Sequence, residues 1–260
     1  MPRQPRFAPP GYNLHVTQRG NYGQQTFFTD YDHTIFISLI AHYAHTASVD
    51  VLAFCIMSNH VHFILHGHLP DSISHFMQSV TGRYAQYLHY RLRRRGRFWQ
   101  SRFFACALDN PHLVAALRYV ELNPVRAHMV SNPFDYPWSS AIAHAGLAAP
   151  PPWLNLSTFE QLFTPLEWQA YLTELQPSAE ESAIREATRR NLPAAGSPEF
   201  VQALQLVANR KLERYPVGRP KKMGTHPISD LSIGATSQPS NSPTTGPTSQ
   251  FPPPHPANLI

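Results

Sequence analysis

The 260-residue sequence is poor in cysteine, has no long apolar run and, over one long stretch, contains no acidic residue. Its only cysteines, Cys55 and Cys106, are too few for the disulfide framework of a small secreted domain. We expect both to be buried thiols in a reducing compartment. No apolar segment approaches the roughly 20 residues that a membrane span requires, and prolines interrupt the first ten residues, where a signal peptide needs an apolar core. These absences predict a cytoplasmic protein with no membrane partner.

The stretch from Ser72 to Leu108 contains not one Asp or Glu. Arginines and aromatic residues alternate along it, and the whole chain has a formal net charge of +5. Arginines bind phosphates and aromatic rings stack on unpaired bases, so the stretch predicts a surface for single-stranded nucleic acid. The candidate DNA-binding residues are Arg83, Arg91, Arg93, Arg94, Arg95, Arg97, Arg102 and Trp99, with Tyr84, Tyr87, Tyr90 and Phe98 interleaved. Some of these aromatic side chains, Tyr84 among them, are expected in the core, and a basic helix end that contacts only solvent is the alternative.

Hydrophobic periodicity predicts the order strand, helix, strand, strand, helix, strand, helix. The strands are expected at about 12–19, 49–57, 60–66 and 103–108, and the helices at about 30–46, 72–96 and 110–124. Asp30 or Asp32 is the expected cap of the first helix. The first six elements match the ferredoxin-like split βαβ arrangement, an antiparallel sheet of the α+β class, and the last helix is an addition packed against that sheet.

Composition divides the chain further. We expect a flexible leader at 1–10, a compact domain at 11–146, a small helical extension at 147–224 and a disordered Pro/Ser/Thr-rich tail at 225–260. The extension contains three apparent capping boxes, Ser157–Glu160, Thr164–Glu167 and Ser178–Glu181, each marking the start of a short helix.

Two histidines flank a valine in the segment His60-Val61-His62. Successive side chains of a strand point to opposite faces, so His60 and His62 share one face while Val61 and Phe63 enter the core. Two imidazoles on one face suit a single divalent metal ion. A polar strand face that carries histidines by chance is the alternative, because the chain has 15 of them. His66 shares the face by parity, but we expect it too far along the strand to be a ligand.

Tyr119 and Asn123 are four residues apart on the last predicted helix, which places them on one face. A residue before proline is biased away from helical geometry, so this relation is expected to be imperfect at Asn123. An interfacial tyrosine followed by an asparagine cap is the alternative.

Together these segments resemble the HUH single-tyrosine transposases, in the branch of REP-associated tyrosine transposases and their insertion-sequence relatives. The matching segments fall in the family's order over roughly residues 10–145. They are HVTQRGN at 15–21, MSNHVH at 57–62, FWQSRF at 98–103, YVELNPVRA at 119–127 and YPWSS at 136–140.

The resemblance implies a mechanism and its residues. Tyr119 matches the nucleophile, and His60, His62 and Asn123 match the ligands of a Mg²⁺ or Mn²⁺ ion. The implied reaction cuts single-stranded DNA with hairpin structure, leaves a 5′-phosphotyrosine and a free 3′-hydroxyl, and then rejoins the strand. On this interpretation 11–146 is the catalytic domain of a DNA-recombining endonuclease, acting as a monomer or a homodimer.

Two other functions remain open at this point. A domesticated regulator could bind single-stranded DNA on the same fold without productive transposition. A metal-dependent hydrolase could use the histidine pair alone and would form no covalent protein–DNA species. Tyr84, Tyr87 and Tyr90 are rival nucleophiles, because they lie in the basic stretch.

Overall fold

The computed structural model of the protein describes residues 6–174, 177–209 and 211–212. The predicted tail at 225–260 and the first five residues of the predicted leader lie outside the described part of the chain. The strands are β1 (Asn13–Arg19), β2 (Val49–Ile56), β3 (His60–Gly67), β4 (Phe104–Leu108) and β5 (Ala194–Ala195). The helices of the first half are α1 (Asp30–Thr46), α2 (Ser72–Leu92), α3 (Asn110–Glu121), α4 (Asn123–Arg126) and α5 (Ala141–His144). Those of the extension are α6 (Ser157–Glu160), α7 (Pro165–Thr173), α8 (Ala179–Arg190) and α9 (Pro198–Ala208), and short 3₁₀ turns lie at Asn21–Gly23 and Pro133–Asp135.

The sheet has the strand order β2-β3-β1-β4-β5. Its first four strands pair antiparallel, which is the predicted ferredoxin-like arrangement and confirms the α+β class. β5 adds a parallel fifth strand against β4. This strand was not predicted, because two alanines carry no periodic signal.

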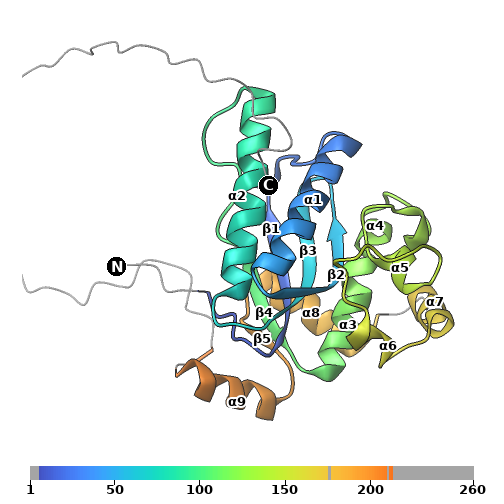
Figure 1. The fold of residues 1–260 in the computed structure, drawn as a ribbon. Helices are drawn as coiled ribbons and strands as arrows, with labels where there is room; N and C mark the ends of the chain where they lie inside the picture. The colour runs from blue at the N-terminus through green and yellow to red at the C-terminus, as the bar shows by residue number, and fades with distance from the viewer. Residues whose placement is uncertain (1–5, 175–176, 210, 213–260) are drawn as a thin grey trace, which may run out of the picture.

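Helices cover both faces of the sheet (Figure 1). On one face α1 and α2 bury a core that includes Val16, Phe36 and Phe63. On the other face α3 packs with the extension, and Ile64 and Leu117 share a core with Trp168 and Ile184. The sheet is therefore the middle of three layers, as expected for strands that are apolar on both faces.

The extension is packed into the molecule. Trp168 of α7 and Ile184 of α8 are fully buried, in the same core as Leu113 and Leu117 of α3. The predicted boundary at residue 146 thus separates two parts of the sequence whose side chains meet in one core.

Several element ends differ from the prediction. The cap of α1 is Thr29, and Asp32 completes its capping box. α2 ends at Leu92, before the expected Gly96, because Arg93 adopts a left-handed conformation with φ of 50°. α3 ends at Glu121, because Pro124 interrupts the helix and the separate turn α4 starts at Asn123.

The three expected capping boxes have three outcomes. Thr164 and Glu167 form one as predicted. Ser157 lies inside α6 and makes no cap. Ser178 caps α8, but the Glu181 side chain turns away from it.

Both cysteines are buried free thiols, as expected. In the part of the chain that the structure describes, no helix is both long enough and apolar enough to cross a membrane.

Candidate active site

His60 and His62 lie on β3, a strand paired on one side with β1 and on the other with β2. Their ring centroids are 4.9 Å apart, so both imidazoles are on one face, as strand alternation predicts. Val61 and Phe63 point into the opposite core. The two rings are close enough to approach one ion.

Each histidine has one ring nitrogen engaged by the protein. Nδ1 of His60 is 2.5 Å from the Asn59 side-chain oxygen, and Nδ1 of His62 is 2.9 Å from Nε2 of His15. Burial lowers the pKa of His60 to about 4 and that of His62 well below its usual value. Both are neutral near pH 7, which is the state that binds metals, and Nε2 of each remains for a ligand.

His15 is a residue that the sequence interpretation missed. Its ring stacks parallel to that of His62 at 5.2 Å, and its Nδ1 is 3.4 Å from the Thr188 hydroxyl of α8. Burial lowers the pKa of His15 to about 3. Leu14 and Val16 flank it in β1 and enter the core, so alternation alone could have placed His15 on the face of the histidine pair.

Tyr119 lies on α3, over this face of the sheet. Its ring centroid is 5.8 Å from that of His62 and 5.7 Å from that of His15, and both contacts are edge-to-face. The side chain is buried, and burial raises the pKa of the phenol, whereas the charges of Arg126 and Arg185 act in the opposite direction. The structure therefore brings Tyr119 and the histidine pair together from distant parts of the sequence.

Arg126 and Glu181 hold the end of α3 and were not singled out from the sequence. The Arg126 guanidinium lies 5.0 Å from the centre of the Tyr119 ring and donates to the Tyr119 carbonyl at 2.8 Å. Glu181 of α8 is almost fully buried and forms ion pairs with both Arg126 and Arg118. Its Glu-after-Ser spacing resembled a capping box, so the sequence gave no signal for these pairs.

Asn123 is the first residue of α4, and its side chain points back along α3. Its amide nitrogen donates to the carbonyls of Tyr119 at 2.9 Å and Val120 at 3.3 Å. The side-chain oxygen is the atom left for another partner. Asn123 lies beyond the end of α3, which agrees with the irregularity expected before Pro124.

The donor set of this site fits a divalent ion in part. Two neutral imidazoles and an amide oxygen provide three uncharged donors, and Mg²⁺ in particular prefers oxygen, so phosphate oxygens of a substrate would have to complete the shell. Among the described residues, no three His, Cys, Asp or Glu side chains form a metal centre by themselves. Substrate and ion would therefore bind together.

The rival tyrosines are differently placed. Tyr84 is fully buried and donates to the Thr26 carbonyl, and Tyr87 donates to the Asp32 carboxylate at 2.9 Å. Burial raises the pKa of both phenols. Tyr90 is half exposed on the last turn of α2, and none of its contacts given by the structure involves the histidine pair.

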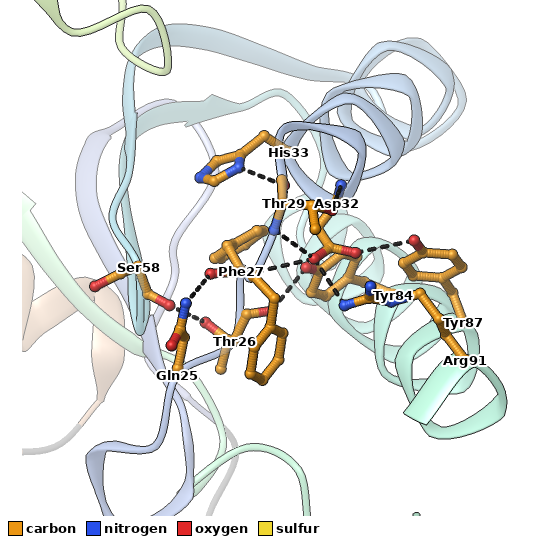
Figure 2. A network of polar contacts seen from close by, with 11 residues as sticks. Gln25, Thr26, Phe27, Thr29, Asp32, His33, Ser58, Tyr84, Tyr87 and Arg91 are labelled. Carbon is orange, nitrogen blue, oxygen red and sulfur yellow. Dashed lines mark hydrogen bonds and ion pairs between the residues drawn. The ribbon is translucent and has the colours of Figure 1, made fainter. Parts of the chain in front are cut away.

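The arginine stretch has an acidic partner that the sequence interpretation did not foresee. Asp32 of α1 is fully buried and forms an ion pair with Arg91 at 2.9 Å (Figure 2). Trp99 is half-buried and donates to the Thr81 carbonyl, so it lies largely in the core. The remaining candidates are exposed, with no ion pair to a described residue: Arg83, Arg93, Arg94, Arg95, Arg97 and Arg102.

Comparison with known proteins agrees with the sequence motifs. The family model described as "Transposase IS200 like" matches residues 10–123. A solved structure of a REP-associated tyrosine transposase bound to a REP hairpin matches 60% of this chain and 92% of its own, at 19% identity and a TM-score of 0.49. No curated protein matches. Residues 10–123 are thus similar to the IS200-like transposases, in agreement with the HUH single-tyrosine motifs of the sequence.

Proposed function

We propose that the protein cleaves and rejoins single-stranded DNA through a covalent bond to Tyr119. The observation that carries this proposal is the contact of Tyr119, on α3, with His62, on β3. Their ring centroids are 5.8 Å apart. A tyrosine with only a structural role has no need of a neutral histidine pair on the facing strand. The similarity of residues 10–123 to the IS200-like transposases supports DNA as the substrate class.

The Tyr119 hydroxyl would attack the phosphorus of one phosphodiester. A bond forms between the phenol oxygen and phosphorus, and the bond from phosphorus to the 3′ oxygen breaks. The phenol loses one proton and the leaving 3′ oxygen gains one, so the step needs neither ATP nor water. The free 3′-hydroxyl can later attack the phosphotyrosine and restore a phosphodiester.

His60, His62 and the side-chain oxygen of Asn123 are the proposed ligands of Mg²⁺ or Mn²⁺. When bound, such an ion polarises the phosphodiester as a Lewis acid. The protein's own residues supply orientation: Asn59 and His15 fix the two imidazoles, and Arg126 holds the Tyr119 ring. Buried second partners of this kind are the usual support of metal-binding histidines.

The substrate that we infer is single-stranded DNA with hairpin structure, as the sequence resemblance implies. Labelled strands from the flanks of the gene, incubated with the protein and Mg²⁺ or Mn²⁺, should give an adduct that survives denaturation. Tyr119→Phe should abolish the adduct and the cleavage while DNA binding stays nearly intact, because only a hydroxyl is lost. Tyr90→Phe is the matched control and should react like the unmodified protein.

The other outcomes identify the alternatives. An adduct that persists in Tyr119→Phe would show that the nucleophile is wrongly assigned. Cleavage without any adduct would indicate the metal-dependent hydrolase. Tight binding without cleavage under either metal would indicate the domesticated regulator.

A further inference from the structure

Four large aromatic side chains are exposed near the start of α1 and the end of α2. The exposed fractions are 96% for Tyr22, 53% for Tyr31, 50% for Tyr90 and 40% for Phe28. Single exposed aromatic residues are common on protein surfaces, but a group of them beside unpaired positive charge marks an interaction site. Of the interleaved aromatic residues singled out from the sequence, only Tyr90 belongs to this group, because Tyr84, Tyr87 and Phe98 are buried.

These side chains border the exposed arginines. Phe28 lines one hollow with Arg94, Arg95 and Arg97. Tyr90 lines a neighbouring, wider hollow of about 680 Å³ with Arg93, Arg94 and Arg95. The two hollows share Arg94 and Arg95, so Phe28 and Tyr90 flank one basic surface.

A buried carboxylate fixes the base of this surface (Figure 2). Asp32 accepts hydrogen bonds from the backbone amides of Phe28 and Thr29, from the Tyr87 hydroxyl and from Arg91, each at 2.9 Å. The Arg91 guanidinium in turn lies 5.6 Å from the centre of the Phe28 ring, and Tyr31 packs its edge on Tyr87. Arg91 is therefore bound to the protein itself, and it helps to hold the Phe28 ring in place.

The surface continues toward the histidine pair through the loop before α1. The Asn59 side chain, beside His60, donates to the Gly23 carbonyl at 3.0 Å, and Gln24 lines the hollow of Phe28. Tyr22 lies in this loop with φ of 53°, a left-handed conformation that an aromatic residue rarely adopts. Its strained backbone presents an almost fully exposed ring next to Gly23, and strain of this kind concentrates at functional sites.

We propose that Tyr22, Phe28, Tyr31 and Tyr90 form a platform on which unpaired bases of a DNA strand stack, while Arg93, Arg94, Arg95 and Arg97 bind its phosphates. That the strand is DNA rests on the proposed function. Stacking on aromatic faces requires unpaired bases, so the platform selects single strands over duplexes. Its loop end, at Gly23, is hydrogen-bonded to Asn59 next to His60, so the strand would lead from there toward Tyr119.

The test measures affinity of the full-length protein for an unstructured oligonucleotide and for a duplex, in EDTA so that no cleavage intervenes. Replacing any one platform ring by leucine should weaken single-strand binding about tenfold and leave duplex affinity and the salt slope unchanged. The four variants are Tyr22→Leu, Phe28→Leu, Tyr31→Leu and Tyr90→Leu. The matched controls keep the ring: Tyr22→Phe, Tyr31→Phe and Tyr90→Phe should bind like the unmodified protein. Arg94→Ala should instead lower the salt slope by about one.

Photocrosslinking of an oligonucleotide carrying 5-iododeoxyuridine gives a readout that a purely structural role would not produce. Crosslinks should map to the four rings. The proposal is overturned if the leucine variants bind like the unmodified protein, if they lose single-strand and duplex binding equally, or if crosslinks map elsewhere. Because these measurements need no cleavage, failure to form a Tyr119 adduct would count against the proposed reaction and leave the platform standing.

Discussion

The histidine pair and Tyr119 face each other across the candidate site, but they are held by different kinds of interaction. His60 and His62 lie on β3, which is hydrogen-bonded along both sides by β1 and β2. Tyr119 lies on α3, whose outer side is covered by α7 and α8 of the extension. The strand geometry is set by the sheet within the family-matched residues 10–123, whereas the helix depends on residues beyond them.

Buried polar side chains make that dependence specific. Glu121 of α3 is fully buried and accepts from Trp168 of α7 at 2.8 Å, and Glu181 of α8 pairs with Arg118 and Arg126. A buried charge that loses its partner is costly, so α3 requires the extension. The helix that carries Tyr119 is therefore supported by a segment that contains none of the family's motifs.

The largest effect should come from removing the extension. A fragment ending at residue 146 loses Trp168, Ile184 and Glu181, which leaves the buried Arg118 without its partners and takes the Trp168 hydrogen bond from Glu121. The loss is comparable to the whole stability of a domain, about 5–15 kcal/mol, so the fragment should not unfold cooperatively. Circular dichroism during heating measures this, and a chain ending at residue 224 is the control that should melt like the full protein. A fragment 1–146 with an unchanged melting temperature would show that α3 does not need the extension.

A smaller, sharper test changes one carboxylate of α8. Glu181→Gln should lower the free energy of unfolding by about 3–5 kcal/mol, because the buried Arg118 and the half-buried Arg126 lose their counter-charge. Glu186→Gln, on the same helix, breaks the exposed pair with Arg189 and should cost less than about 1 kcal/mol. Urea denaturation of both variants provides the comparison. Equal effects would mean that the buried pairs do not hold α3.

Lowering the pH should destabilise the fold through the buried histidines of β1 and β3. Burial lowers the pKa of His15 to about 3 and that of His60 to about 4, from an ordinary value of 6.5. Below pH 6.5 these histidines are protonated in the unfolded chain but stay neutral in the folded chain. The free energy of unfolding therefore falls as the pH falls. The expected loss is about 2 kcal/mol per histidine between pH 6.5 and 5. Urea denaturation in metal-free buffer measures it, and His15→Gln should make the pH dependence shallower. An unchanged slope in that variant would show that His15 titrates normally.

The same contrast explains what could be predicted from the sequence. Alternation in 60–66 placed His60 and His62 on one face, and the ferredoxin-like order followed from local periodicity. The pairs Asp32–Arg91 and Glu181–Arg118 join residues far apart in the chain, and no local pattern indicates them. Trp99 was assigned to DNA because it lies among arginines, but its indole donates into the fold at Thr81. Phe28 and Tyr31 lie outside the arginine stretch, and only the folded chain brings them beside it.

Asn123, at the end of α3, should give the smallest effect. Its amide caps the end of α3, and its oxygen is the proposed third ligand. Asn123→Ala should slow cleavage less than His60→Ala or His62→Ala, which should abolish it, because water can replace one neutral oxygen ligand. The lost cap should lower the free energy of unfolding by about 0.5–1.5 kcal/mol.

Asn123→Asp separates the two roles, since it keeps an oxygen but removes the donor to Tyr119. If the oxygen binds the ion, Asp should cleave better than Ala at limiting Mn²⁺ although both lose the cap. Equal rates and equal stabilities for the two variants would assign Asn123 to the cap alone.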